Sequence, residues 1–333
     1  MSVWGVWAGL ADSVFVADID DSDRRPARIA ATIAVGLAAG LAAAVAGWLL
    51  VSLAYILATD HGVHGLRGLG HVAARMADVR AGGLALTLLR LGVATVTDGG
   101  FLFAFVAVAA IVARRRLRAY VTAAAHIRWR LFAMGVVLSA LFMAPLVAAD
   151  RLLSMDGTAL PILTISSLPA GRLVYALSTL LLIPAAAAEE LFFRGWLLRQ
   201  MAAFSRRPAV LIGVTALIFS AVHFDFSPDG FLTRALMGAG FAYMTLRLGG
   251  IEFSAGVHTI NNTLIVLFLQ PLSLDTAAAS PNITPGSALE DVALIAGYIL
   301  ITEVVARAPS LRRWAGLRSE EISRADANAA HPS

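Results

Sequence analysis

Long apolar runs, separated by short arginine-rich segments, dominate this chain of 333 residues. The first long run, Ile33 to Leu57, contains no charged residue, and about 20 apolar residues are enough for a helix to cross the hydrocarbon of a bilayer. Each comparable run predicts a transmembrane helix. Together they predict an all-α, polytopic membrane helical bundle of about eight transmembrane helices, at residues 31–57, 84–113, 131–149, 172–203, 208–225, 230–248, 250–270 and 288–306.

Two features near the second predicted helix depart from this pattern. Asp98-Gly99-Gly100 lies inside the run, so the helix is expected to start late or to be interrupted there. The preceding segment, 58–83, has room for an interfacial helix. Its three histidines suggest a metal site, but glycine and arginine lie between them and no carboxylate has ligand spacing, so a solvated loop is favoured. These histidines are His61, His64 and His71.

The composition indicates that lipid is the solvent for much of the surface. Hydrophobic residues make up 59% of the chain and charged residues 14%, with a mean hydropathy of +0.77, whereas soluble domains are about 25% charged. The absence of cysteine excludes disulfides and thiolate nucleophiles. The net charge of +4 comes from arginines between the apolar runs. It therefore indicates topology, and not nucleic-acid binding, for which no long polar segment is present.

The positions of the arginines predict the orientation in the membrane. With eight spans, the main clusters all fall on one side, which the positive-inside rule assigns to the cytoplasm. Arginines near 67–80 fall on the other side, against the rule. We expect a multi-pass protein of a bacterial cytoplasmic (inner) membrane, with both termini in the cytoplasm. The main clusters lie at 24–28, 114–130, 199–207, 247 and 307–318.

The chain is expected to divide into three parts. Residues 1–30 form a cytoplasmic N-terminal segment, in which the acidic run Asp18–Asp23 argues against a cleaved signal peptide. Residues 31–306 form the membrane-embedded helical domain, with a motif-bearing core at about 172–270. Residues 307–333 form a cytoplasmic, disordered tail, because its end is polar and alanine-rich.

The fourth predicted span contains charged residues, which are costly inside a bilayer and are therefore functional candidates. Glu190 and Arg194 are four residues apart and can pair along one helix face. Glu189 points about 100° away from Glu190, so it has no partner on its own helix. An unpaired carboxylate at low dielectric can accept or donate a proton near neutrality.

Two further spans add polar side chains to this group. If the turn after the fourth span lies at Ser205–Pro208, Glu189 and His223 lie at nearly the same depth, because each helical residue rises about 1.5 Å. The helical hairpin then brings them together. His258 and Asn262 share a face of the seventh span, one turn apart. They can offer two hydrogen-bond donors to a common point, as stabilisation of an oxyanion requires.

A structural interpretation competes with this functional one. A lone intramembrane histidine or asparagine often forms only a helix–helix hydrogen bond, worth about 0.6–2 kcal/mol, and a Glu–Arg pair can act as a clamp. Two glutamates, two histidines, an arginine and an asparagine on three neighbouring helices favour a functional site over structural pairing alone.

The order of these residues resembles the CAAX protease and bacteriocin-processing (CPBP, or Abi) family of intramembrane endopeptidases. The three motifs of that family are Glu-Glu-x-x-x-Arg, Phe-x-x-x-His and His-x-x-x-Asn/Asp. All three occur here in order, each in an apolar span, over about 172–270. The matching residues are Glu189, Glu190, Arg194, Phe219, His223, His258 and Asn262.

The resemblance implies a glutamate-dependent protease with a membrane-associated peptide or protein substrate. By analogy, Glu189 and His223 activate the water that attacks the scissile carbonyl, and His258 and Asn262 hold the oxyanion. Family members include the eukaryotic CAAX prenyl endopeptidase and bacterial proteins of bacteriocin maturation, self-immunity and peptide-signal processing, and the sequence does not choose among these. By the same analogy, Glu190, Arg194 and Phe219 support the catalytic residues, and Glu190 and Arg194 orient the site.

Two other functions could use the same residues. A proton- or cation-coupled transporter would show inverted repeats or paired broken helices, and only Pro184 suggests such a break. A non-catalytic membrane scaffold or bacteriocin-immunity protein is compatible with intact motifs. No cofactor is expected. Zinc held by His223, His258 and a glutamate is disfavoured, because His-Glu-x-x-His is absent and Asn262 is a poor zinc ligand.

Overall fold

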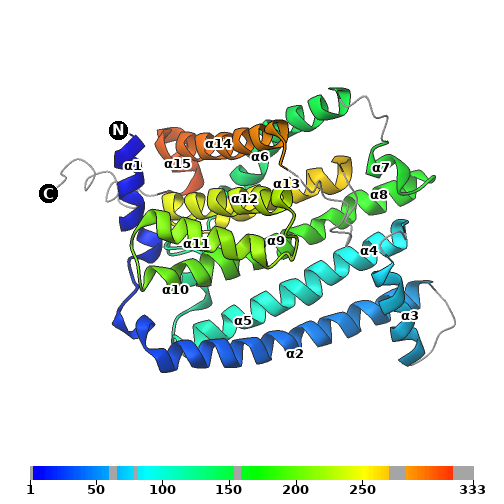
Figure 1. Cartoon of the computed structure of the whole chain (residues 1–333), viewed down its shortest axis with the longest axis horizontal. Coiled ribbons are helices and arrows are strands. Elements are labelled where there is room, and N and C mark those ends of the chain that lie inside the picture. The colour runs from blue at the N-terminus through cyan, green and yellow to red at the C-terminus, as the bar shows by residue number, and fades with distance from the viewer. Residues whose placement is uncertain (1–2, 60–65, 79–81, 154–158, 270–282, 318–333) are drawn as a thin grey trace.

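The computed structural model describes residues 3–59, 66–78, 82–153, 159–269 and 283–317. Within these ranges the chain is helical and contains no β-strand, apart from one isolated bridge between Thr122 and Gly250. The long helices run side by side along the long axis of the molecule (Figure 1). This confirms the predicted all-α membrane helical bundle.

Four helical stretches among the described residues are long and apolar enough to cross a membrane, and they coincide with the first four predicted spans. The second and fourth stretches are each built from several helices. The four are α2 (Pro26–Thr59), α4 with α5 (Leu84–Gly92 and Gly99–Val112), α6 (Trp129–Leu153), and α8 with α9 and α10 (Pro169–Ser178, Leu182–Glu190 and Leu198–Ala202).

The other four predicted spans are also occupied by helices, but these are shorter or more polar. Every residue of α12 from Gly240 to Leu248 is buried, so its second half lies inside the bundle. Its charged residue Arg247 pairs with Glu303 of α14 at 2.7 Å. The charged residue of this buried half thus contacts protein and not lipid. The four helices are α11 (Pro208–Ala221), α12 (Pro228–Leu248), α13 (Glu252–Leu264) and α14 (Pro285–Arg307).

The helix ends follow from proline and glycine in the sequence. Proline is the first residue of many of the long helices, where its missing N–H would be unpaired in any case and its fixed φ suits the first turn. Gly249 ends α12 with φ 72°, a left-handed conformation that glycine adopts without strain. The prolines are Pro26, Pro169, Pro208, Pro228 and Pro285.

The second span is distorted but not broken. Residues Val93–Asp98 form a π-helical turn between α4 and α5, and α5 starts directly at Gly99. The interruption expected at Asp98-Gly99-Gly100 is therefore a local widening of a continuous helix. Thr95 Oγ1 in this turn lies 2.8 Å from the Leu91 carbonyl oxygen of its own span and 3.0 Å from the Leu181 carbonyl oxygen of the fourth span, so the two spans are in close contact here.

The fourth span also departs from α-helical geometry. A 3-10 turn, Thr179–Leu181, precedes α9, because the ring and missing N–H of Pro184 disturb the α-helical pattern one turn earlier. A π-helical turn, Leu191–Leu197, then separates α9 from α10. Such turns recur at functional sites, and this one contains Arg194.

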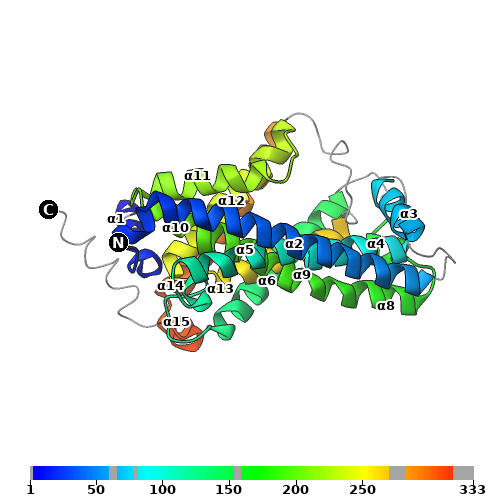
Figure 2. The same ribbon diagram turned by 90° about the horizontal axis from the view of Figure 1, so that it is seen from below.

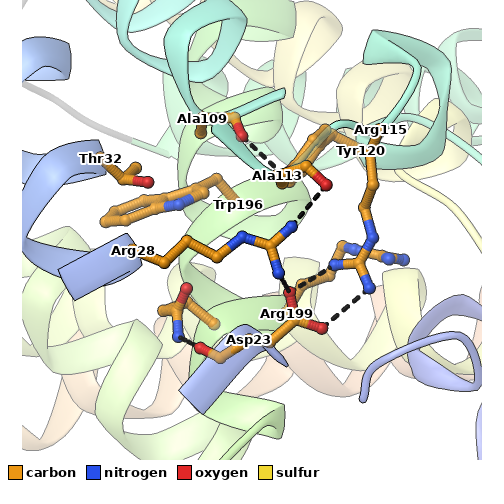
Figure 3. A pocket seen from close by; sticks show the side chains of 10 residues that line it. Asp23, Arg28, Thr32, Ala109, Ala113, Arg115, Tyr120, Trp196 and Arg199 are labelled. Carbon is orange, nitrogen blue, oxygen red and sulfur yellow. Dashed lines mark hydrogen bonds and ion pairs between the residues drawn. The ribbon is translucent and has the colours of Figure 1, made fainter. Parts of the chain in front are cut away.

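The N-terminal segment folds over one end of the bundle, which also carries α15 (Figures 1 and 2). Phe15 is fully buried among bundle residues. Asp23 lies among arginines (Figure 3), with both of its oxygens 2.8 Å from Arg115 nitrogens. Arg199 donates to the carbonyl of Phe15 and to Asp18. Of the segment predicted for residues 1–30, residues 3–25 thus form a folded N-terminal cap that starts with α1 (Val3–Gly9), and the remainder from Pro26 belongs to α2.

Two predicted connecting segments contain additional helix. The tail predicted for 307–333 begins with α15 (Pro309–Ala315), which buries Ala315 and is therefore not a disordered chain there; residues 318–333 lie outside the described residues. In the segment 58–83, α3 (Leu66–Ala77) is the helix for which the sequence left room. His71 lies on α3, whereas His61 and His64 fall outside the described residues.

Candidate active site

The three motifs meet where α11 ends. Helix α11 has 14 residues, and its turn into α12 lies part-way along the bundle, whereas α2 and α8 continue beyond it (Figure 1). Gly238 of α12 packs against α11, where a Cβ atom would stand 3.0 Å from the Ala216 Cα and crowd the helices. The close packing of α11 and α12 brings the end of α11 next to α9 and α13.

Glu190 and Arg194 form a fully buried ion pair. Arg194 Nη1 lies 2.9 Å from Glu190 Oε1, and both side chains are 0% exposed. Arg194 Nη2 donates to the Gly238 carbonyl at 3.1 Å, and the guanidinium lies 4.3 Å from the centroid of the Phe219 ring. The pairing predicted from their spacing is confirmed. The pair ties α9 and the π-helical turn to α11 and α12.

His258 of α13 lies between the two glutamates. Its Nδ1 is 3.1 Å from Glu190 Oε1, and its Nε2 is 3.8 Å from Glu189 Oε2. The ring stacks on Phe241 of α12, with centroids 4.8 Å apart and an interplanar angle of 25°. Because an ionised carboxylate can only accept hydrogen bonds, Nδ1 carries a proton towards Glu190. This orients Nε2 towards the side of Glu189.

His223 is held in one tautomer by the backbone. It follows the last residue of α11, and its Nδ1 lies 2.7 Å from the Phe219 carbonyl oxygen. A carbonyl can only accept a hydrogen bond, so Nδ1 carries the hydrogen and neutral His223 has a free lone pair on Nε2. The half-buried His223 interacts electrostatically with Glu189 and His258.

Glu189 is the accessible member of the glutamate pair. Its side chain is 27% exposed, yet its Oε2 is buried without a hydrogen-bond partner in the protein. The sequence predicted that Glu189 lies opposite His223, and the two residues are electrostatic neighbours. The sequence did not predict that His258 also lies against Glu189. Glu189 thus has a partly exposed side chain and one buried oxygen that no protein group satisfies.

The remaining predicted residues have clear positions. Phe219 is buried, and its ring centroid lies 4.9 Å from that of His223 and 6.1 Å from that of His258. It therefore supports both imidazoles. Asn262 is half-buried one turn beyond His258, and its Oδ1 accepts a hydrogen bond from Asn261. All seven predicted residues lie on the elements that converge here.

Sequence reasoning did not include Phe241 or Asp98 in this site. In the sequence, Phe241 looks like any other apolar residue of a predicted span, so no signal marks it as part of the site. Asp98 was interpreted only as a helix interruption. It is exposed on the π-helical turn of the second span and interacts electrostatically with Glu189. The rule that an ionisable residue in an apolar span is a functional candidate would have found it.

A cavity of about 610 Å³ lies near α9 but on its opposite face. It is lined by Pro184, Ala187 and Leu191 of α9 and by Trp129 of α6, and no motif residue contributes to it. It is therefore separate from the group around Glu189. Among the described residues, no cluster of three or more histidine, aspartate or glutamate side chains is arranged to hold a metal ion.

Comparison with known proteins finds a family match over the part of the chain that contains the site. Residues 170–264 match the family described as type II CAAX prenyl endopeptidase Rce1-like. The uncharacterized protein YyaK of Bacillus subtilis (strain 168) is 27% identical over 169 residues, which is 47% of this chain. The chain spans about half of that relative, 54% of its length. No solved structure matches.

The matched range contains every motif residue, from Glu189 to Asn262. It begins at the start of α8 and ends with α13, so it covers the helices that build the site. The family is one of CAAX-type intramembrane proteases. Residues 170–264 are therefore Rce1-like, and the resemblance to the CAAX protease and bacteriocin-processing family that the motifs indicated is confirmed.

Proposed function

We propose that this chain is an intramembrane endopeptidase that hydrolyses a peptide bond of a membrane-associated protein or peptide, with a water activated by Glu189 and His223. The main support is the fixed tautomer of His223. Its Nδ1–H is bound to the Phe219 carbonyl, so Nε2 can accept a proton. Next to it, Glu189 presents a carboxylate with an oxygen that no protein group satisfies.

The reaction begins when Glu189 and His223 remove a proton from water, whose oxygen bonds to the scissile carbonyl carbon. Negative charge then develops on the carbonyl oxygen. His258 and the Asn262 amide donate hydrogen bonds to it, which stabilises the tetrahedral intermediate. The intermediate collapses when the C–N bond breaks, and the proton taken from water passes to the leaving amine.

Glu190 and Arg194 act as positioning residues in this mechanism. With Nδ1–H bound to Glu190, His258 can donate from Nε2 only as an imidazolium, and the adjacent Glu190 carboxylate stabilises that form. Arg194 holds Glu190 in place at 2.9 Å. The arrangement parallels other catalytic triads, in which a buried carboxylate fixes the orientation of a histidine.

The peptidase assignment is tested with Glu189→Gln, which removes the base and keeps the size of the side chain. Membrane-associated peptides of cells that express the wild type or this variant are compared by mass spectrometry. The matched control is Glu290→Gln, because Glu290 is an exposed carboxylate on α14. We expect peptides that the wild type and the control release and that Glu189→Gln does not. Identical peptides from all three proteins would contradict the proposal.

We further propose that the end of the bundle covered by the N-terminal cap faces the cytoplasm of a bacterial inner membrane. Arginines from the N-terminal segment, the 114–130 segment and α10 gather at this end, as the positive-inside rule requires of a cytoplasmic face. A reporter inserted after Arg116 should be active only in the cytoplasm. Periplasmic activity of that reporter would reverse the orientation.

A further inference from the structure

The Asn262 side chain can serve the proposed reaction in only one of its two orientations. A carboxamide has an oxygen that accepts and an NH₂ group that donates, and a 180° rotation exchanges them. Only the NH₂ group can stabilise an oxyanion. Some neighbour must therefore fix the orientation of Asn262, and the preceding residue is in a position to do so.

Asn261 contacts the oxygen end of Asn262. Its Nδ2 donates to Asn262 Oδ1 at 3.3 Å, which leaves the NH₂ group of Asn262 free. Side chains of consecutive helical residues normally point in different directions, so this contact is not a consequence of helix geometry alone. Asn261 is 2% exposed, and burial leaves its amide dependent on partners in the protein.

Two residues from other helices fix the orientation of Asn261 itself. Its Nδ2 lies 4.0 Å from Met237 Sδ on α12. A thioether sulfur can only accept, so the nitrogen must face Met237. On the opposite side, the Tyr298 hydroxyl of α14 donates to Asn261 Oδ1 at 3.3 Å. Because a tyrosine hydroxyl can donate or accept, the Met237 contact sets the assignment of nitrogen and oxygen, and the Tyr298 contact agrees with it.

Tyr298 lies in the apolar core and is itself held in place. It is 1% exposed, and its ring makes an edge contact with Phe142 of α6 at a centroid distance of 5.8 Å. The hydroxyl also lies 2.6 Å from Met143 Sδ, but a carboxamide oxygen is a stronger acceptor than a thioether. Tyr298 lies outside the matched range 170–264. A helix beyond the Rce1-like range thus contributes to the geometry of the site.

We propose that Asn261 is a positioning residue which, held by Tyr298, fixes the carboxamide of Asn262 with its NH₂ group towards the reacting carbonyl. The proposal rests on the proposed peptidase function. Asn261 has no contact with the reacting atoms in this scheme. Its effect is confined to the orientation of Asn262, and it should therefore change kcat without changing how well substrate binds.

The first test compares Asn261→Leu and Asn261→Asp with Asn262→Ala. Leucine removes the hydrogen bonds at similar size. Aspartate can only accept, so it draws the NH₂ group of Asn262 away from the substrate. The probe is a synthetic peptide spanning a bond that the wild type cleaves and Glu189→Gln does not. We expect kcat to fall about 100-fold for Asn262→Ala and about 10-fold or more for both Asn261 variants, with KM changed less than about twofold.

The second test separates positioning from a general packing role. In the double variant Asn261→Leu with Asn262→Ala, kcat should equal that of Asn262→Ala alone, because the orientation of an absent amide cannot matter. Tyr298→Phe should also lower kcat and provides a second variant in case Asn261→Leu does not fold. The matched control is Tyr243→Phe. It also removes a tyrosine hydroxyl, but that hydroxyl donates to Glu303, elsewhere on α14, at 2.6 Å.

The outcomes distinguish this proposal from the function on which it rests. Wild-type kcat in the Asn261 variants, together with a loss in Asn262→Ala, overturns the positioning role and leaves the peptidase intact. Multiplied losses in the double variant also overturn it, because they show that the two residues act independently. Full activity in both Asn262→Ala and Glu189→Gln removes the proposed function, and the inference with it.

Discussion

The site contains two regions that differ in burial. In the closed region, Glu190 and Arg194 are 0% exposed and His258 is 4% exposed, and each is bonded to another member. In the open region, Glu189 is 27% exposed and His223 is half-buried. Adjacent residues of one helix thus have opposite environments. In the proposed reaction, the closed region maintains the geometry and the open region meets the substrate.

The largest expected effect separates the two regions by activity. His223→Ala, like Glu189→Gln, should lower peptide release about 100- to 10,000-fold, because it removes a proton acceptor from the reaction. The free energy of unfolding should change by less than about 1 kcal/mol in both variants. Neither the Glu189 nor the His223 side chain is fully buried, and neither forms a hydrogen-bonded ion pair. Peptide release and thermal melts in detergent are measured on the same preparations. If both variants unfold, the open region also stabilises the fold, and the proposed division between an open region for activity and a closed region for stability is wrong.

In the closed region, the main expected effect is on stability. Arg194→Met leaves the Glu190 carboxylate buried without its cation, which should lower the free energy of unfolding by about 3–5 kcal/mol. Combining it with Glu190→Gln should restore stability more fully than activity. Melting curves in detergent report the first quantity and peptide release the second.

The matched control for Arg194→Met is Arg307→Met. Glu303 and Arg307 have the same four-residue spacing on a helix, but the Arg307 side chain is 53% exposed. An exposed pair of this kind contributes about 1 kcal/mol or less. Equal stability losses at the two positions would show that burial does not distinguish the pairs.

The smallest expected effect is that of metal removal. We expect chelators to leave peptide release unchanged, because Glu190 Oε1 already accepts hydrogen bonds from Arg194 and His258 and is a poor metal ligand in that state. The assay compares rates before and after chelation, with zinc added back. Activity lost to the chelator and restored by zinc would make the open region a metal site and would leave the protease assignment in place.

The sequence could predict the features that depend on local spacing. Apolar runs located the helices, and the four-residue spacing of Glu190 and Arg194 predicted their ion pair. The position of His258 between two glutamates depends on how α13 is rotated against α9, which packing across the bundle determines. Phe241, which stacks on His258, has no distinguishing mark in the sequence. The pattern also placed His223 within a span, whereas α11 ends at Ala221.

The short length of α11 has a consequence for how water and substrate meet. Fourteen residues of helix extend about 21 Å, whereas the hydrocarbon of a bilayer is about 30 Å thick. Irregular backbone at that depth is tolerated only against protein or a water-filled space. The exposed phenyl rings of Phe224 and Phe226 adjoin this turn. The backbone beyond α11 must therefore find protein or water as its partner at that depth, and in the proposed reaction this position would let water reach His223 from within the bilayer.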